Sequence, residues 1–156
     1  MKDLLTKEHI VKHGVDIKNL ISTDKGIALR VKTDTQDLAF TGLGYQLTAK
    51  GDLDSYCNYE NGVKNGVYVQ YYNQSCLKSI TSFKFGLKTG LEQVWYKNGK
   101  VKSLAEYKYN ICLHSMLWDQ RGQLLKQKLE PSDEELLKLQ QVSKYLKEQG
   151  GVNYKL

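Results

Sequence analysis

The middle of the chain alternates apolar and polar residues with a period of two rather than with helical spacing. Segments such as GVYVQYY (66–72), CLKSITSFK (76–84) and KVKSLAEYK (100–108) combine β-branched and aromatic side chains with small or charged ones. This composition and alternation are typical of half-buried β-strands. Sequences rich in Asn, Gly and Ser separate the segments, as turns require. The pattern therefore predicts strands that run up and down as successive antiparallel hairpins.

The hairpin pattern repeats every 24 residues. A shift of 24 places LKS (77–79) on VKS (101–103) and Phe83 on Tyr107. A further, degraded copy begins near Leu113 with one residue deleted. A fixed period in this range indicates a repeat architecture. The predicted fold is mainly β: an antiparallel meander of 24-residue β-hairpin repeats with a C-terminal capping α-helix.

Each outgoing strand of the repeats begins with a glycine, at Gly42, Gly66 and Gly90. Such a glycine indicates backbone with φ > 0, or neighbouring hairpins that approach too closely for a Cβ atom. A glycine loop that cradles phosphate would need a helix N-terminus directly after it, and the sequence offers none here. We therefore predict a structural role for these glycines.

The two ends of the chain differ from the middle. TKEHIVKHG (6–14) is consistent with one short helix stopped by its final glycine, and a further hairpin is expected around residues 24–26. Near the other end, Ser132 as N-cap and Glu135 three residues later form a capping box for a helix over residues 132–148. These patterns add helices only outside the repeats.

An apolar stripe follows one side of the C-terminal helix at helical spacing, at Leu136, Leu139, Val142 and Leu146. A lone sheet cannot bury both of its faces, so we expect this helix to cover part of one face or the last edge. The alternative is that the stripe binds a partner.

The composition is that of one folded domain. The 156 residues are 40% hydrophobic and 26% charged, with a single proline. No apolar run reaches the roughly 18 residues of a membrane span, and the N-terminus lacks the apolar core of a secretory signal. A cytoplasmic protein is therefore expected. We expect a single domain over 1–156, with a short helix and hairpin in 1–40, the repeats in 41–129 and the C-terminal helix in 130–156.

Positive charge is concentrated in the repeats. From Lys64 to Lys128 there are eleven Lys or Arg residues against three acidic ones, a net charge of +8, compared with +6 for the whole chain. Such a field steers an acidic partner toward this segment. Nucleic acid is the less favoured partner, because Arg30 and Arg121 are the only arginines and no known nucleic-acid-binding motif occurs.

Residues suited to catalysis or metal binding are scarce. His9 and His13 stand four apart, but the motif lacks the general-base glutamate of HExxH, and lysines flank it. Asp52 and Asp54 flank a turn, whose chemistry accounts for both. The three cysteines form no CxxC pair and are expected to be free, buried or half-buried thiols. We predict no catalytic residue, no metal site and no cofactor, and hence a binding protein.

Strand alternation divides the aromatic residues between two faces of the sheet. One face is predicted to carry Val67, Val69 and Tyr71 with Leu91, Gln93 and Trp95. The other is predicted to carry Tyr68, Gln70 and Tyr72 with Glu92, Val94 and Tyr96. The first set is more apolar and is the expected core, whereas the second is expected to be exposed and suits protein recognition. The predicted partner-binding residues are Tyr68, Tyr72, Lys78, Glu92, Tyr96 and Lys102. Alternatively, the tyrosines form cross-strand pairs that only stabilise the sheet.

Three segments carry the motifs of a known repeat family: AFTG (39–42) at the start of the repeats, NYENGVKNG (58–66) and TGLEQVWYKNGKVKSLAEYK (89–108). They resemble the MORN-variant repeat proteins of the YwqK-type antitoxin family. The resemblance covers roughly residues 17–129. The sequence departs from the family pattern where alanine replaces the proline of the first motif, and in YNICLHS (109–115), where the fourth unit has lost the motif.

The resemblance implies an immunity or antitoxin function, in which a small cytoplasmic protein binds a cognate bacterial toxin domain by direct stoichiometric contact. Because the repeats are basic, the toxin is expected to present an acidic surface. Two alternatives remain: a basic, aromatic sheet that binds nucleic acid, and a MORN-type scaffold apposed to an anionic membrane. No amphipathic anchoring helix or lipidation motif supports the membrane alternative. The oligomeric state is left open.

Overall fold

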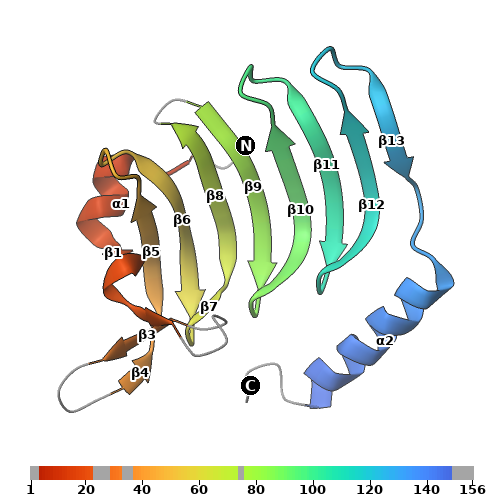
Figure 1. Cartoon of the computed structure of the whole chain (residues 1–156). Helices are drawn as coiled ribbons and strands as arrows, with labels where there is room; N and C mark the ends of the chain where they lie inside the picture. Colours follow the sequence, from red (N-terminus) through yellow and green to blue (C-terminus); the bar gives the residue numbers. More distant parts are fainter. Residues whose placement is uncertain (1–3, 23–28, 33–36, 74–75, 149–156) are drawn as a thin grey trace.

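A large antiparallel sheet dominates the computed structural model, which describes residues 4–22, 29–32, 37–73 and 76–148 (Figure 1). The sheet has ten strands in the order β1-β5-β6-β8-β9-β10-β11-β12-β13, with β7 paired to β6. From β5 onward each strand pairs antiparallel with the next, and β1 pairs parallel with β5 at the opposite edge. The prediction of a mainly β antiparallel fold with a C-terminal helix is confirmed.

The strands of the large sheet are β1 (Val15–Asp16), β5 (Gly42–Leu47), β6 (Leu53–Glu60), β7 (Val63–Lys64), β8 (Gly66–Asn73), β9 (Cys76–Lys84), β10 (Leu87–Trp95), β11 (Val101–Lys108), β12 (Ile111–Trp118) and β13 (Leu124–Lys128). A small second sheet contains β2 (Ile21–Ser22), β3 (Leu29–Lys32) and β4 (Asp37–Ala39). The helices are α1 (Lys7–His13), the 3-10 turn η1 (Ile17–Asn19) and α2 (Asp133–Glu148). The antiparallel pairing of β2 with β3 agrees with the predicted N-terminal hairpin, whose turn at 24–26 lies outside the described residues.

Two-residue turns connect the repeats at one end of the sheet. Both residues of each turn have positive φ, which is the type I′ geometry that matches the twist of antiparallel strands. These turns are Asn61-Gly62 (φ 51 and 84), Phe85-Gly86 (53 and 74) and Tyr109-Asn110 (52 and 67). Their spacing is the 24-residue period of the sequence.

Hydrogen bonds tie each of these turns to the preceding repeat. The second residue of each turn donates its backbone N–H to a carbonyl oxygen of the previous unit. The pairs are Gly62 to Phe40 (2.7 Å), Gly86 to Lys64 (2.8 Å) and Asn110 to Lys88 (2.9 Å). The turns therefore form a continuous chain of contacts along one end of the sheet.

The opposite ends of the hairpins close with longer turns that contain a positive-φ glycine. In the turn between β10 and β11, Tyr96 donates its N–H to the carbonyl of Lys100, and Gly99, at φ 80, donates back to Tyr96. Gly51 and Gly122 occupy the same place in the turns before β6 and β13. The corresponding turn between β8 and β9 includes residues 74–75, which lie outside the described residues.

One extra residue interrupts the strand pairing at the same place in every hairpin. At this place the returning strand has one residue more than the outgoing strand. The extra residues are Asp54, Lys78, Lys102 and Leu125. A β-bulge of this kind bends its strand and increases the local twist. The regular bulges account for the curved strands visible in Figure 1.

The glycines that begin the outgoing strands have the backbone geometry predicted for them. Gly66 and Gly90 have φ values of 122° and 101°, a region in which residues with a Cβ atom are strained. Each lies directly opposite an aromatic residue of the returning strand, Phe83 for Gly66 and Tyr107 for Gly90. The repeated glycine is therefore required by the backbone.

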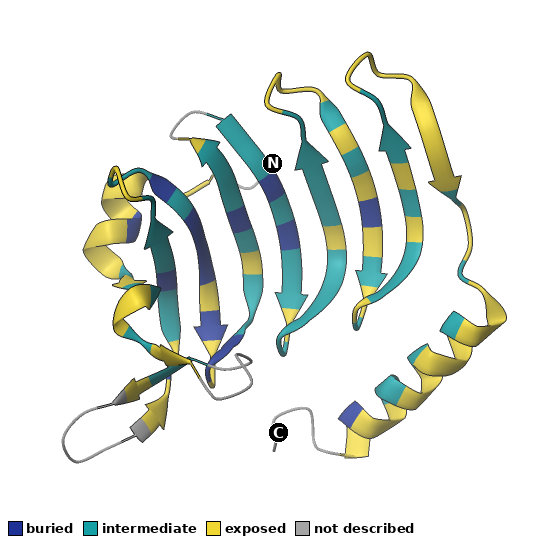
Figure 2. Cartoon of the chain, in the orientation of Figure 1, coloured by how far each residue is buried: buried dark blue, intermediate teal, exposed yellow. Residues whose placement is uncertain are grey.

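The hydrophobic core lies at the N-terminal end of the sheet, on both of its faces. One cluster places Ile10 of α1 against Leu53, Tyr56 and Val69. The second cluster contains Phe40, Cys57 and Tyr59, with partly buried residues of η1, β3 and β8 packed against it. In Figure 2 the buried positions are most frequent toward α1, whereas β13 and most of α2 are exposed.

Side-chain capping contacts mark the start of both helices, and Gly14 ends α1 as predicted. Thr6 caps α1 by accepting the N–H of His9, and Gly14 ends it. At α2 the Ser132 hydroxyl accepts the N–H of Glu135, whose carboxylate in turn accepts the N–H of Ser132, so the capping box is confirmed. No helix in the described part of the chain is long and apolar enough to cross a membrane.

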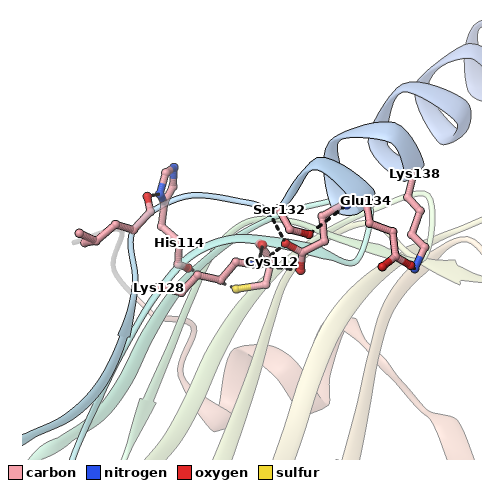
Figure 3. Close-up of polar contacts among 8 residues, drawn as sticks. Cys112, His114, Lys128, Ser132, Glu134 and Lys138 are labelled. Atoms are coloured by element: carbon pink, nitrogen blue, oxygen red, sulfur yellow. Dashed lines mark hydrogen bonds and ion pairs between the residues drawn. The ribbon is translucent and has the colours of Figure 1, made fainter.

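Helix α2 contacts the sheet at β12 and is joined to the end of the last strand, most of which stays exposed. It contacts β12, and the Lys128 amine donates both to the Glu135 carboxylate (2.6 Å) and to the Cys112 carbonyl (2.7 Å). Figure 3 shows Lys128, Cys112 and Ser132 at this junction. The first four residues of β13 remain exposed. Along the predicted apolar stripe of α2, Leu136 is exposed, Leu139 and Val142 are half-buried and Leu146 is buried.

Candidate functional site

The strand register assigns the side chains of the large sheet to two faces. One face, here called the α1 face, carries a row of residues directly opposite one another, which are Tyr56, Val69, Ile80, Gln93, Leu104, Met116 and Gln127. The other, here called the tyrosine face, carries the row Ser55, Gln70, Ser79, Val94, Ser103, Leu117 and Lys126. Both rows cross six hairpin strands and end on β13, so each face can be compared from repeat to repeat.

The α1 face is covered only over its N-terminal strands. Ile10 is 0% exposed there and packs on Leu53, Tyr56 and Val69. Toward the C-terminus the same face is open: Leu91 is 69% exposed, Leu124 50%, and Leu104 and Met116 40% each. No described element packs over these four side chains. We call Leu91, Leu104, Met116 and Leu124 the open apolar face.

Register places Leu104, Met116 and Leu124 in one contiguous patch through Trp118, with Leu91 diagonal to Leu104. Leu104 lies directly opposite Met116 on the neighbouring strand. Leu124 lies opposite Trp118, and alternation places Trp95 on this face beside them. Leu91 extends the patch on β10, opposite Glu106. Clustered, exposed aliphatic side chains of this kind mark interaction surfaces more often than scattered ones do.

Positive charge flanks the patch at both ends of its strands. Alternation places Lys84 and Lys108 on this face beside the type I′ turns, and both are exposed. At the other end, Lys100 and Arg121 are exposed in the turns, with the Lys100 amine donating to the Arg121 carbonyl (3.4 Å). Glu106 is the one carboxylate on the α1 face of the described residues of β9–β13. The surroundings therefore favour an acidic partner.

The tyrosines predicted as partner contacts lie on the tyrosine face and are half-buried. The Tyr72 hydroxyl donates to the Trp95 carbonyl (3.1 Å), and the Tyr96 hydroxyl donates to the Trp118 carbonyl (2.9 Å). Each bond joins one hairpin to the next at the same point of the repeat. Tyr68 packs against the second core cluster. The prediction that this face is exposed is wrong for these tyrosines, because their rings and hydroxyls connect the repeats.

Glu92, another of the predicted partner contacts on this face, forms an ion pair with Lys88. Lys88 donates to the Glu92 carboxylate at 2.6 Å, and the hydroxyl of Thr81, which is buried, donates to it at 3.1 Å. The side chain of Glu92 is only 15% exposed. Burial, followed by the neighbouring Glu92 charge, raises the pKa of Tyr107 to about 12. Glu92 is therefore engaged inside the protein and not directed at solvent.

The equivalent lysine of the preceding repeat, Lys64, contacts aromatic rings in place of a carboxylate. Lys64 precedes Lys88 by 24 residues, and its amine lies 3.7 Å from the ring centroid of Tyr68 and 5.1 Å from that of Phe83. Tyr68 occupies the position of Glu92. Burial lowers the pKa of Lys64. A cation–π contact in one repeat thus replaces an ion pair in the next.

Lys78 and Lys102, the last two predicted contacts, occupy the bulge positions of their hairpins. Their amines lie 5.9 Å and 5.6 Å from the ring centroids of Tyr72 and Tyr96. Lys102 is exposed and Lys78 half-buried. A bulge changes the direction in which its side chain points, so both lysines lie beside the tyrosines, as expected. Of the six predicted contact residues, Lys102 alone is exposed.

The predicted core set is split by the structure. Val69 is fully buried beneath Ile10, but Leu91 of the same set is the most exposed large apolar residue among those described. The rule that the more apolar face is the core therefore fails in the C-terminal repeats. One signal in the sequence pointed to this outcome, namely the shortness of the N-terminal helix. A seven-residue helix is about 10 Å long, whereas neighbouring strands lie about 4.8 Å apart. Such a helix covers two or three strands in any orientation.

The groups considered for metal binding or catalysis remain scattered. The rings of His9 and His13 lie with their centroids 4.6 Å apart and their planes tilted by 40°. Among the described residues no three His, Cys, Asp or Glu side chains gather as a metal site. The three cysteines are free, with Cys57 buried and the other two half-buried, and burial raises the pKa of the Cys57 thiol to about 11. Comparison with protein-family models, curated proteins and solved structures finds no match.

Proposed function

We propose that this chain is an immunity protein that binds a bacterial toxin domain and blocks it by stoichiometric contact. The observation that carries the proposal is the open apolar face, a continuous aliphatic patch on a hydrogen-bonded sheet, flanked by cations. Protein interfaces combine an apolar centre with a polar, charged rim. A rigid sheet also binds with little loss of conformational freedom, which favours affinity.

The sequence resemblance to YwqK-type antitoxins supports the same proposal. The motifs that carry it recur at 24-residue spacing, and so do the type I′ turns and the bulges. The proposed partner is a toxin that presents an acidic surface, because the repeats carry a net charge of +8.

The nucleic-acid alternative loses its main support. A stacking platform needs aromatic rings that present a face to solvent. Here Tyr68, Tyr72 and Tyr96 are half-buried, and two of them are hydrogen-bonded to the next hairpin. The exposed large hydrophobic side chains of the repeats are aliphatic instead. A protein partner fits this surface better than bases do.

The proposal is tested by neutralisation of the toxin encoded beside the gene for this chain. The purified chain should inhibit that toxin fully at a one-to-one ratio, and its co-expression should restore growth of cells that carry the toxin. Replacing Leu104 with Glu should reduce both effects, whereas Leu137→Glu, on the exposed side of α2, should leave them intact. A chain that neither inhibits nor protects would refute the proposal.

A further inference from the structure

The N-terminal repeats show which kind of element the α1 face accepts. Helix α1 packs one apolar residue, Ile10, against Leu53, Tyr56 and Val69, while its other side chains are exposed. It also contacts β5, and the N–H of Leu5, just before it, donates to the Tyr56 hydroxyl (3.3 Å). An amphipathic helix is thus the natural cover for this face.

The open apolar face continues that surface in register. Leu104 and Met116 occupy the same row as Tyr56 and Val69. From β10 to β13 the face spans about 14 Å at the usual strand spacing. One further helix, with a diameter of about 10 Å, fits this width. The chain's own described helices lie elsewhere, with α1 on the N-terminal strands and α2 in contact with β12 and bonded to Lys128 at the end of β13.

We infer that the open apolar face binds an amphipathic helix of the partner, with apolar residues along one stripe and acidic residues at its ends. This inference rests on the proposed function, since the partner it describes is the toxin. The apolar stripe would pack on Leu91, Leu104, Met116 and Leu124. The acidic ends would meet Lys84 and Lys108 at one end of the strands and Lys100 and Arg121 at the other.

Charge and geometry favour this occupant over two others. A second copy of the chain, packed face to face, would bring together four cations and only one carboxylate from each copy, which is repulsive. The α1 helix of a second copy is also poorly matched to this basic surface, because it carries Lys7 and Lys12 against Glu8 as its one carboxylate. An added strand would pair with the edge of β13 and leave the side chains of the face uncovered.

The inference is tested by titrating the full chain with synthetic helical peptides. The probe is an amphipathic peptide of about 14 residues, long enough to form a helix on binding, with leucines on one stripe and glutamates at both ends. A second peptide carries lysines in place of the glutamates. Two-dimensional NMR detects weak binding, and the fluorescence of Trp95 and Trp118 reports contact with the patch.

We expect the glutamate peptide to bind saturably, with chemical-shift changes confined to β10–β13. The lysine peptide should bind at least about tenfold more weakly. Leu104→Glu and Leu91→Glu should each abolish binding while the spectrum of the free chain stays that of the folded protein. Leu137→Glu is the matched control on α2 and should bind as the parent does. Equal binding of both peptides, no saturable shift, or shifts on α2 would overturn the inference.

The same variants separate this inference from the proposed function. If Leu91→Glu and Leu104→Glu still neutralise the toxin, the inference is wrong while the function stands. If the peptides bind as expected but the parent chain protects no cell from the neighbouring toxin, the immunity function is wrong and the helix-binding surface stands. Self-association of the parent chain that either variant abolishes would show a second copy on the face and would overturn the inference.

Discussion

The two halves of the α1 face are built from the same repeat and have different surroundings. Over β5, β6 and β8, Ile10 packs on the face and buries Leu53, Tyr56 and Val69, while Val67 at the end of β8 is still 37% exposed. Over β10–β13, the same register positions carry exposed aliphatic residues that no described element covers. The difference does not lie in the strands themselves, because turns, bulges and inter-hairpin bonds recur in both halves.

This contrast shows that the repeats determine which side chains share a face of the sheet but not whether that face is buried. Burial depends on whether a second element reaches the face, and α1 is too short to reach past the first strands. The tyrosine face follows another rule. There, small residues such as Ser79, Thr81 and Ala105 are buried between the larger side chains of the sheet itself. Half-buried tyrosines on this face stabilise the contact between repeats.

The largest effect should come from removing the side chain that closes the N-terminal half. Ile10→Ala deletes a fully buried group and leaves a cavity, and we expect it to lower the free energy of unfolding by about 2–5 kcal/mol. Val11→Ala, on the exposed side of the same helix, should cost less than about 0.5 kcal/mol. Urea denaturation followed by circular dichroism measures both. Equal losses would mean that α1 is held by its backbone and not by Ile10.

A smaller loss should follow from breaking the ion pair on the tyrosine face. Glu92→Gln leaves Lys88 and Thr81 without their anionic partner, and we expect a loss of about 1–3 kcal/mol. Glu106→Gln, an exposed carboxylate on the α1 face, should change stability by less than about 0.5 kcal/mol. The two variants are compared by thermal unfolding at low and high salt. If Glu92→Gln were neutral but weakened toxin binding, Glu92 would be a partner contact after all.

Deleting one inter-hairpin hydrogen bond should have a still smaller effect. Tyr96→Phe removes the hydroxyl that donates to the Trp118 carbonyl, and we expect a loss of about 0.5–1.5 kcal/mol. Tyr145→Phe, at an exposed position of α2, is the control and should be neutral. Chemical denaturation of the two variants in parallel gives the difference. Affinity for the proposed toxin partner should be unchanged by either, which distinguishes a structural tyrosine from an interface tyrosine.

The smallest change concerns the junction between α2 and the sheet. Hydrogen bonding to Lys128, and then to the Ser132 N–H, lowers the pKa of Glu135 to about 2 from its usual 4.5. A lowered pKa in the folded state means that the stabilisation is complete above about pH 4.5 and is lost as the pH falls toward 2. Backbone NMR signals of the first turn of α2 should therefore shift in that interval. Glu135→Gln should abolish the shift, and its persistence in this variant would assign it to another group.

Much of the fold could be predicted because it depends on neighbours in the sequence. The Asn61-Gly62 turn, the capping box of Ser132 and Glu135, and the glycines that open each outgoing strand all act within a few residues. Their physical causes are the permitted φ values of glycine and the local hydrogen bonds of a helix end. The 24-residue period then sets the meander, since each hairpin pairs with the one that follows it.

The candidate site could not be predicted in the same way. The sequence assigned Leu91 to the core and Tyr96 to the exposed face, because the more apolar set of alternating residues is usually the buried one. That inference holds at Val69, which is covered by Ile10 of α1, nearly 60 residues away in the chain. It fails at Leu91, which no described element covers. The strands' faces follow from local alternation, but which of them is covered depends on long-range packing, and only the tertiary structure decided it.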